Sequence, residues 1–355
     1  MNGNQRRPTL RDVAARVGTT IPTVSKVLSG RSDVSDETRS AILAVVAELG
    51  YRLPAGRATA ARGTGVPSVD LVISGIEGTW ANRALIGVER AAVDAQFDLI
   101  VSVARHPDDG WLKRLLARPS QGAVLALVNA SNDQLAALSA AAIPVVLLDP
   151  VTQPPDFVSS VGATNWDSGR AVAEHLIGLG HHELAIVAGR RDQLYSQARV
   201  DGFRSAAESA GANLPPDRIV HANWSRSDAR EAGMELLESA NPPTAIFACS
   251  DTMALGIYEA AREVGTAIPG GLSVVGFDDL PEGEWMIPQL TTVRQPIADM
   301  GAAAFRMLLR APGRTGPAER EQLSTTLVIR ESTGVPRASG TLSRAFSTDA
   351  GRGAE

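Results

Sequence analysis

Apolar positions in the first fifty residues recur at helical spacing in three short stretches. The stretch LRDVAARV places its apolar side chains on one face of a helix that stops at Gly18. A second helix follows, with Thr20 as its cap, Pro22 in its first turn and the apolar residues of VSKVL on its buried side. A third begins at Ser35, where AILAVVAEL gives the spacing i, i+3, i+4, i+7. The pattern predicts a three-helix unit over residues 1–51.

The pattern changes after a stretch rich in Pro, Gly, Ala and Arg, RLPAGRATAARGTGVP, which is typical of a linker. Beyond it, apolar strand-like runs alternate with amphipathic helices, which predicts parallel sheets with right-handed crossovers. About 265 residues are too many for one compact sheet, so we expect two sheets side by side. The expected parts are a helix-turn-helix head (1–51), a hinge (52–67), a first core subdomain (68–163 and 291–322), a second (164–290 and 323–332) and a disordered tail (333–355).

The charges are divided unevenly along the 355 residues, which the net charge of −5 conceals. Residues 1–63 carry 10 Lys and Arg against 5 Asp and Glu, whereas residues 64–355 carry 24 against 34. One of the two lysines, Lys26, lies in the basic part. A basic helical end on an acidic body favours a nucleic-acid partner for that end and a different role for the body.

Two closely spaced helices with a capped second helix are typical of a helix-turn-helix, which presents the second helix to the DNA major groove. The alternative is an ordinary helical hairpin. Hydroxyl and basic side chains on this unit, among them Thr9, Thr23, Ser25 and Arg31, give a surface that can reach phosphates and bases.

The residues TLRDVAARVGTTIPTVSKVLSG followed by VSDETRSAILAVVAELGY closely resemble the LacI/GalR family of bacterial transcriptional regulators. Later segments are similar to the core motifs of that family: HLIGLGHHELAIVAG, SQARVDGFRSA, TAIFACSDTMALG, LSVVGFDDLP and PQLTTVRQP. The resemblance spans residues 9 to about 332. It implies a helical head and a hinge helix, followed by two α/β subdomains similar to periplasmic sugar-binding proteins.

The resemblance implies base reading at the start of the second helix, by Thr20, Ile21 and Pro22, with Lys26 one turn further on. Ile21 and Pro22 can read only by apolar contact, so Lys26 is the expected guanine or phosphate contact, unless Ile21 only packs. Family members usually wedge a hinge leucine into the minor groove, where this chain offers Ala60 or Ala61. We expect shallower bending, with Arg57 and Arg62 at minor-groove or phosphate positions. The expected DNA-binding residues are Thr9, Thr20, Ile21, Pro22, Thr23, Ser25, Lys26, Ser29, Arg31, Tyr51, Arg57, Ala60 and Arg62.

Ligands of open α/β sheets bind beyond the carboxyl ends of the strands, where four of the five tryptophans of this chain also lie. A flat indole packs against a pyranose, and Asp, Asn and Arg bond its hydroxyls. The resemblance to the family implies that Arg199 and Asp278 bind hydroxyl groups of the effector. The expected effector-binding residues are Trp80, Asp149, Trp166, Arg199, Trp224, Ser250, Asp251, Asp278 and Trp285.

Several of these residues have a structural alternative. Trp166 and Trp285 can cover the hinge between the subdomains, and Arg199 with Asp278 can form an interdomain salt bridge. Asp251 can be a helix N-cap and Asp149 a turn former before Pro150. 

No enzyme signature is present: the chain lacks a phosphate loop, a Gly-x-Ser-x-Gly elbow and a Gly-x-Gly-x-x-Gly fingerprint after a strand. Adjacent Asp278 and Asp279 point to opposite faces of a strand, which argues against a glycosidase pair. With one cysteine, no metal-ligand spacing and neither a signal core nor a membrane-length apolar run, we expect a cytosolic protein without cofactor or metal.

The sequence therefore predicts a homodimeric repressor that binds a pseudopalindromic operator and is released when a carbohydrate closes the cleft between the subdomains. Helix 79–95 and the segment near 108–118 would form much of the dimer face if the family arrangement holds. Three alternatives are a regulator with a co-repressor such as a purine, a binding protein that feeds transport, and a sugar-converting enzyme.

Overall fold

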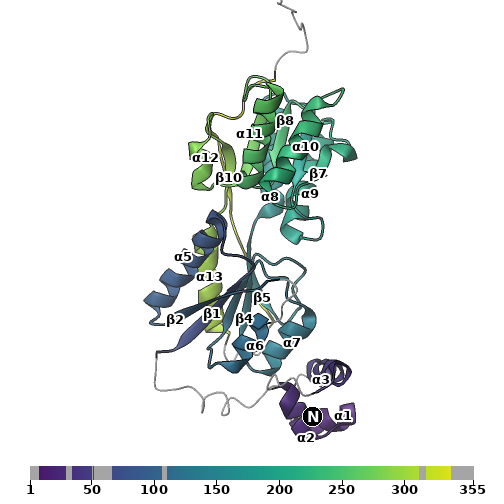
Figure 1. The fold of residues 1–355 in the computed structure, drawn as a ribbon, viewed down its shortest axis with the longest axis vertical. Coiled ribbons are helices and arrows are strands. Elements are labelled where there is room, and N and C mark those ends of the chain that lie inside the picture. The colour runs from purple at the N-terminus through teal and green to yellow at the C-terminus, as the bar shows by residue number, and fades with distance from the viewer. Residues whose placement is uncertain are drawn as a thin grey trace, which may run out of the picture.

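The computed structural model describes residues 8–28, 34–49, 51, 66–105, 110–311 and 317–336. A helical head lies at one end, followed along the long axis by two α/β lobes, each built on a six-stranded sheet (Figure 1). The predicted fold class is confirmed.

The head consists of α1 (Leu10–Val17), α2 (Ile21–Leu28) and α3 (Asp36–Leu49). Thr9 and Asp12 cap α1 with reciprocal side-chain to backbone hydrogen bonds, and Gly18 ends it at φ +77°, a conformation that favours glycine. Buried Val13, Val24 and Ile42 contribute to its small core.

The first sheet has the strand order β11-β5-β4-β3-β1-β2, with every adjacent pair parallel. Its strands are β1 (Ser68–Ile73), β2 (Asp98–Val103), β3 (Ala123–Ala126), β4 (Val145–Leu148), β5 (Ser159–Ala163) and β11 (Arg320–Leu323). Its helices are α5 (Thr79–Asp94), α6 (Gly110–Ala117), α7 (Asn132–Ala140) and α13 (Ile297–Arg310). Alternate residues of β1 belong to two apolar clusters, because α5 and α13 cover one face and α6 and α7 the other (Figure 1).

The second sheet has the order β12-β10-β9-β8-β6-β7, in which only the β10–β12 pair is antiparallel. Its strands are β6 (Leu184–Ala188), β7 (Ile219–His221), β8 (Ala245–Ala248), β9 (Ser273–Asp278), β10 (Thr291–Arg294) and β12 (Thr326–Val328). Its helices are α8 (Asn165–Gly178), α9 (Leu194–Ser209), α10 (Arg226–Glu238), α11 (Asp251–Val264), α12 (Pro281–Trp285) and the 3₁₀ turn η1 (Pro216–Arg218).

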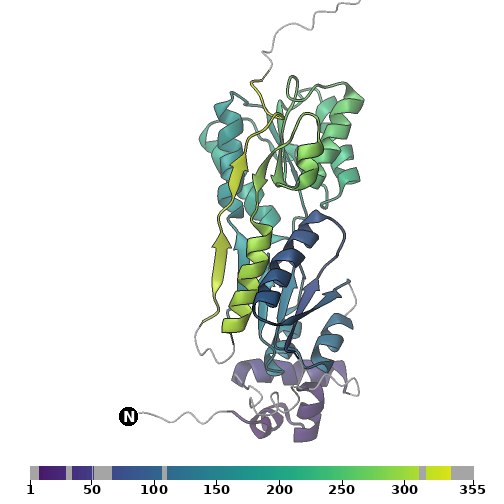
Figure 2. The same ribbon diagram turned by 90° about the vertical axis from the view of Figure 1, so that its left-hand side faces the viewer.

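The predicted return of the chain to the first sheet at residue 291 is wrong. Strand β10 pairs with β9 in the second sheet, so the chain crosses back only at residues 295–296. Strand-like periodicity marks a strand but carries no information about which sheet it joins. The short strands β11 and β12 were not predicted, and they run one after the other, one in each sheet (Figure 2).

The predicted tail begins too early at residue 333. The Gly334 carbonyl oxygen accepts a hydrogen bond from the buried His181 ring, and the Gly334 N–H donates one to the buried Ser273 hydroxyl. Both partners belong to the second lobe. Residues 337–355 lie outside the described part of the chain. Among the described helices, none combines the length and the apolar character needed to cross a membrane.

Helices α8 and α9 approach each other through glycines. A Cβ on Gly169 would lie 2.0 Å from the carbonyl oxygen of Arg199, and one on Gly202 would lie 1.9 Å from that of Trp166. The two helix backbones are therefore in direct contact, and this contact fixes the position of Arg199 relative to α8.

We predict that Gly169→Ala destabilises the protein by about 1–3 kcal/mol, because the new methyl group forces the two helices apart. Gly178→Ala, in the same helix, is the matched control, since no described residue outside its own helical turn has an atom within 4 Å of its Cβ position. That substitution should stabilise the protein by ~0.5–1 kcal/mol. Urea unfolding measures both, and equal effects of the two substitutions would contradict the close contact.

Candidate functional site

The second helix of the head has one buried and one exposed side. Val24, Val27 and Leu28 are buried, whereas Ile21 is 39% exposed. The exposed group also contains Pro22 and Ser25, with Thr23 and Lys26 partly exposed beside them. The exposure of Ile21 in the first turn leaves its side chain available for apolar contact outside the head.

The threonine hydroxyls also have local roles. The Thr20 hydroxyl accepts a hydrogen bond from the Thr23 N–H at 3.3 Å and lies 2.8 Å from the Thr23 hydroxyl, so it caps α2 as predicted. Tyr51 does not fit its predicted role in DNA contact: it is only 5% exposed, because it closes the apolar core of the head. The predicted contacts Ser29, Arg31, Arg57, Ala60 and Arg62 lie outside the described residues.

A second group of predicted residues meets between the lobes. Asp149 follows β4 of the first lobe, while Arg199 on α9 and Asp278 at the end of β9 come from the second lobe. Their exposed fractions are 3%, 2% and 6%. We call these three residues, with Asn165 and Trp224, the Arg199 cluster.

The Arg199 guanidinium is held in a fixed orientation. Its Nε donates to Asn165 Oδ1 at 2.8 Å, and its Nη1 donates to the Cys249 carbonyl at 2.6 Å. Three aromatic rings surround its Cζ, with centroids at 3.5 Å for Phe277, 5.6 Å for Trp224 and 5.8 Å for Tyr195. Stacking on Phe277 and two hydrogen bonds leave the group little freedom to turn.

One of the two carboxylates of the cluster is not fully paired. Asp278 Oδ1 lies 3.9 Å from Arg199 Nη1, and this buried oxygen accepts no hydrogen bond from the described residues. Burial raises the pKa of Asp278 to about 7, although Arg199 opposes the shift, and burial raises the pKa of Asp149 to about 6, opposed by Arg199 and Gln295. A buried acceptor without a donor is a place for a ligand hydroxyl.

The arrangement suits a neutral polyhydroxy ligand. Carboxylates from both lobes can accept from ligand hydroxyls, the guanidinium can donate to them, and aromatic faces can cover an apolar ring face. Trp80 of the first lobe lies at this junction, where its Nε1 donates to Gln295 Oε1 at 3.1 Å. Among the residues that the structure describes, no group of three or more His, Cys, Asp or Glu could hold a metal ion.

Four predicted effector residues have other surroundings. Asp251 Oδ1 accepts from the Thr292 hydroxyl at 2.5 Å and Oδ2 from the Leu280 N–H at 2.6 Å, so internal partners occupy both oxygens. The Ser250 hydroxyl caps α11 through the Met253 N–H. Trp285 is 73% exposed, and Trp166 is 40% exposed with Arg170 over its ring.

Four residues around the cluster were not predicted as ligand contacts. Gln295 directly follows β10 and Asn165 lies two residues after the end of β5, so the rule that located Asp149 could have found them. Tyr195 and Phe277 gave no such signal, since one lies inside a helix and the other inside a strand.

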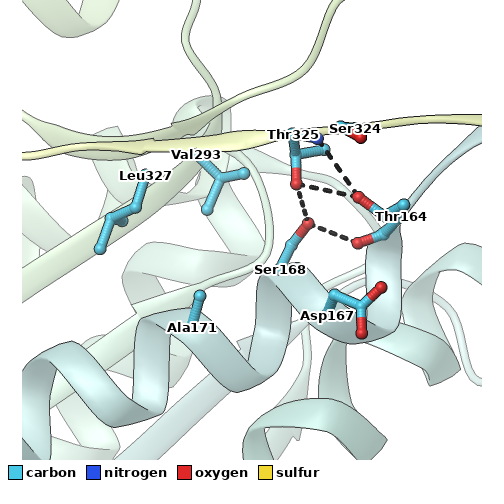
Figure 3. Close-up of a pocket in the computed structure, with 8 residues that line it drawn as sticks. All are labelled: Thr164, Asp167, Ser168, Ala171, Val293, Ser324, Thr325 and Leu327. Carbon is cyan, nitrogen blue, oxygen red and sulfur yellow. Dashed lines mark hydrogen bonds between the residues drawn. The ribbon is translucent and has the colours of Figure 1, made fainter.

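A separate hollow of about 300 Å³ lies beside the segments that cross between the lobes. Its hydroxyls satisfy one another: Ser168 bonds the Thr164 carbonyl and lies 2.6 Å from the Thr325 hydroxyl, and Thr325 also contacts Thr164 (Figure 3). These contacts join two of the crossing segments through the hydroxyls of Thr164, Ser168 and Thr325.

Comparison with known proteins extends these observations. Residues 9–53 match bacterial regulatory proteins of the lacI family, and residues 173–333 match the periplasmic binding protein-like domain. The HTH-type transcriptional regulator DegA of Bacillus subtilis is 31% identical over 336 residues, which cover 92% of this chain and 98% of DegA.

The chain belongs to the LacI family of bacterial transcriptional regulators. Its fold matches a complex of the transcriptional regulator CelR with cellobiose at a TM-score of 0.71 and 31% identity, covering 92% of this chain and 100% of the chain in that structure. A Lac repressor dimer bound to operator and the anti-inducer ONPF matches at 0.69 and 26% identity, covering 93% and 100%. As predicted, the family consists of DNA-binding regulators rather than enzymes.

We predict that Asp278→Asn makes this regulator more stable at pH 8 than the unchanged chain. The pKa of Asp278 is raised on folding, so its contribution is complete below about pH 4 and is lost as the pH rises through about 7. The variant removes this loss and should gain ~1–4 kcal/mol at pH 8. Thermal unfolding from pH 5 to 8 measures the effect; a parallel decline of both proteins would contradict it. Asp217→Asn, at an exposed carboxylate, is the control.

Proposed function

We propose that this regulator is a transcriptional repressor whose operator affinity is lowered by a carbohydrate bound between its two lobes. The observation that carries the proposal is the Arg199 cluster, in which a buried guanidinium lies between buried carboxylates from both lobes, one of which, Asp278, has an oxygen without a hydrogen-bond donor among the described residues. A neutral sugar satisfies such groups without adding charge, and the surrounding aromatic rings suit its C–H face.

The solved CelR complex supports an oligosaccharide as the ligand, because CelR is in complex with cellobiose and the fold is similar over 92% of this chain. A sugar that bonds Asp149 in one lobe and Asp278 in the other favours the arrangement in which the lobes are closed. The sugar changes operator affinity only if it binds the closed and the open arrangement of the lobes with different affinity. A coupling free energy of about 1–3 kcal/mol between the two binding events is typical.

The exposed side of α2 is the proposed base-reading surface. Ile21 and Pro22 offer apolar contacts to a thymine methyl, while Lys26, Thr23 and Ser25 offer donors one turn along. Thr9 and Thr20 stand at the N-termini of α1 and α2, where backbone N–H groups favour phosphates.

A homodimer is the proposed assembly. Ile86, Val93 and Val101 are 42%, 61% and 43% exposed on α5 and β2, and β2 is the edge strand of the first sheet. An apolar surface beside a strand edge that no described strand pairs with favours a protein partner, and an operator with two half-sites matches two heads. A monomer mass by light scattering at micromolar concentration would contradict the dimer.

We predict that cellobiose or another oligosaccharide releases this regulator from an operator selected out of a random duplex library. Fluorescence anisotropy of the labelled operator, titrated with oligosaccharides, monosaccharides and purines, measures the response. Asp149→Asn should raise the sugar midpoint by about tenfold, since a neutral amide replaces a charged acceptor, and should leave operator affinity without sugar within about twofold.

The same titration tests the alternatives. A purine or another metabolite that tightens operator binding would replace the sugar-inducer proposal with a co-repressor. Conversion of the sugar during the titration would contradict a role restricted to binding.

We predict that Lys26→Ala weakens operator binding by roughly 1–3 kcal/mol if Lys26 reads a base. A phosphate contact would instead weaken binding uniformly across sequences and lower the salt dependence by about one unit. The control is Arg204→Ala, which removes one positive charge from α9 in the second lobe. Equal operator binding by Lys26→Ala and the unchanged chain, at several salt concentrations, would exclude both roles.

A further inference from the structure

The turn after β9 has an unusual backbone. Asp278 and Asp279 are consecutive residues with φ +111° and +54°, a region of backbone conformation that residues other than glycine rarely adopt. Such conformations persist only where surrounding contacts enforce them. The contacts around this turn therefore show what holds it.

Two arginines hold the side chain of Asp279. Arg294 Nε donates to its Oδ2 and Arg330 Nη2 to its Oδ1, each at 2.6 Å, although Asp279 is only 7% exposed. Burial raises the pKa of Asp279, but the bonds from Arg294 and Arg330 outweigh it and lower the pKa overall. On the following residue, the Leu280 N–H donates to buried Asp251 Oδ2. The turn is thus clamped within the second lobe.

The same turn reaches the first lobe through its backbone. Arg83 on α5 donates from Nη1 to the carbonyl of Asp279 at 2.8 Å. One turn earlier on α5, the Thr79 hydroxyl donates to Glu282 Oε1, in α12. Residues 79 and 83 share one face of the helix, so the start of α5 contacts residues 279–282, which contain the end of the turn and the start of α12.

We propose that Asp279 is a positioning residue that couples the effector cluster to helix α5. Its ion pairs with Arg294 and Arg330 fix the strained turn, which presents the Asp278 carboxylate to Arg199 on one side and the Asp279 carbonyl to Arg83 on the other. A change at Asp278 is then transmitted to the first lobe through one residue, without any contact between the ligand and α5. This inference rests on the proposed function for the nature of the ligand, but not for the contact between the lobes.

The contact between the lobes can be tested without a ligand. Cysteines introduced by Arg90→Cys on α5 and Arg262→Cys on α11 carry spin labels, while the native Cys249 is fully buried and stays unlabelled. Pulsed EPR, with labelled chains diluted in unlabelled protein, measures the distance between the lobes. Arg83→Met should add a second, longer population, and Arg83→Lys, which retains a donor, should restore much of the original one.

The matched control is Arg230→Met, which breaks an ion pair with Glu263 inside the second lobe and should leave the distances unchanged. If Arg83→Met gives the same distance distribution as the unchanged chain, Arg83 does not hold the lobes together and the proposal is overturned. This outcome does not depend on whether a sugar is the effector.

The positioning role is tested with cellobiose, or with the sugar that gives the largest response in the operator titration. Asp279→Asn should raise the sugar midpoint by about tenfold, which corresponds to the loss of a charged hydrogen bond. Arg294→Gln, at a residue whose side chain is 57% exposed, gives a smaller increase and remains informative if Asp279→Asn does not fold. Unchanged midpoints in both variants, in a protein that still responds to sugar, would overturn the positioning role; no response in the unchanged chain would overturn the proposed function instead.

Discussion

The buried guanidinium of Arg199 is the constraint around which the two lobes are organised. A positive charge that is only 2% exposed is stable only with partners, because desolvation of an unpaired charge costs several kcal/mol. The partners are an amide, a carbonyl, an aromatic face and two carboxylates, one of which, Asp149, belongs to the other lobe. Separation of the lobes would take that carboxylate away from the guanidinium, so this attraction favours the arrangement in which the lobes are together.

The position of this charge depends on backbone packing some distance from the ligand site. Gly169 and Gly202 let α8 and α9 touch, which places the Arg199 carbonyl against α8 and its side chain over Phe277. Larger residues at these two positions would move the guanidinium by the thickness of a methyl group. Hydrogen bonds tolerate only a few tenths of an ångström, so the orientation of Arg199 requires the two glycines as much as its own partners.

Sequence patterns predicted the three helices of the head and the alternation of strands and helices in two sheets. A strand end also pointed to Asp149, which lies beside Arg199 at the junction of the lobes, whereas Arg199 and Asp278 were expected from the resemblance to the family. The patterns failed at β10, since pairing partners are set by tertiary packing, and at β11, where REQL shows neither an apolar run nor alternation. Asp251 shows a related limit of the pattern: it follows a strand as ligand residues do, but its internal hydrogen bonds to Thr292 and Leu280 become visible only in three dimensions.

The basic head and the acidic body also use electrostatic interactions in two different ways. The basic head can recognise DNA through long-range attraction to phosphates, which salt screens, whereas the cleft uses charges that are nearly inaccessible to solvent and so are screened far less. A regulator whose sensor worked through exposed charges would respond to ionic strength as strongly as to its ligand. Burial of Arg199, Asp149 and Asp278 avoids that interference, and the unpaired Oδ1 of Asp278 leaves room for a hydrogen bond from a ligand.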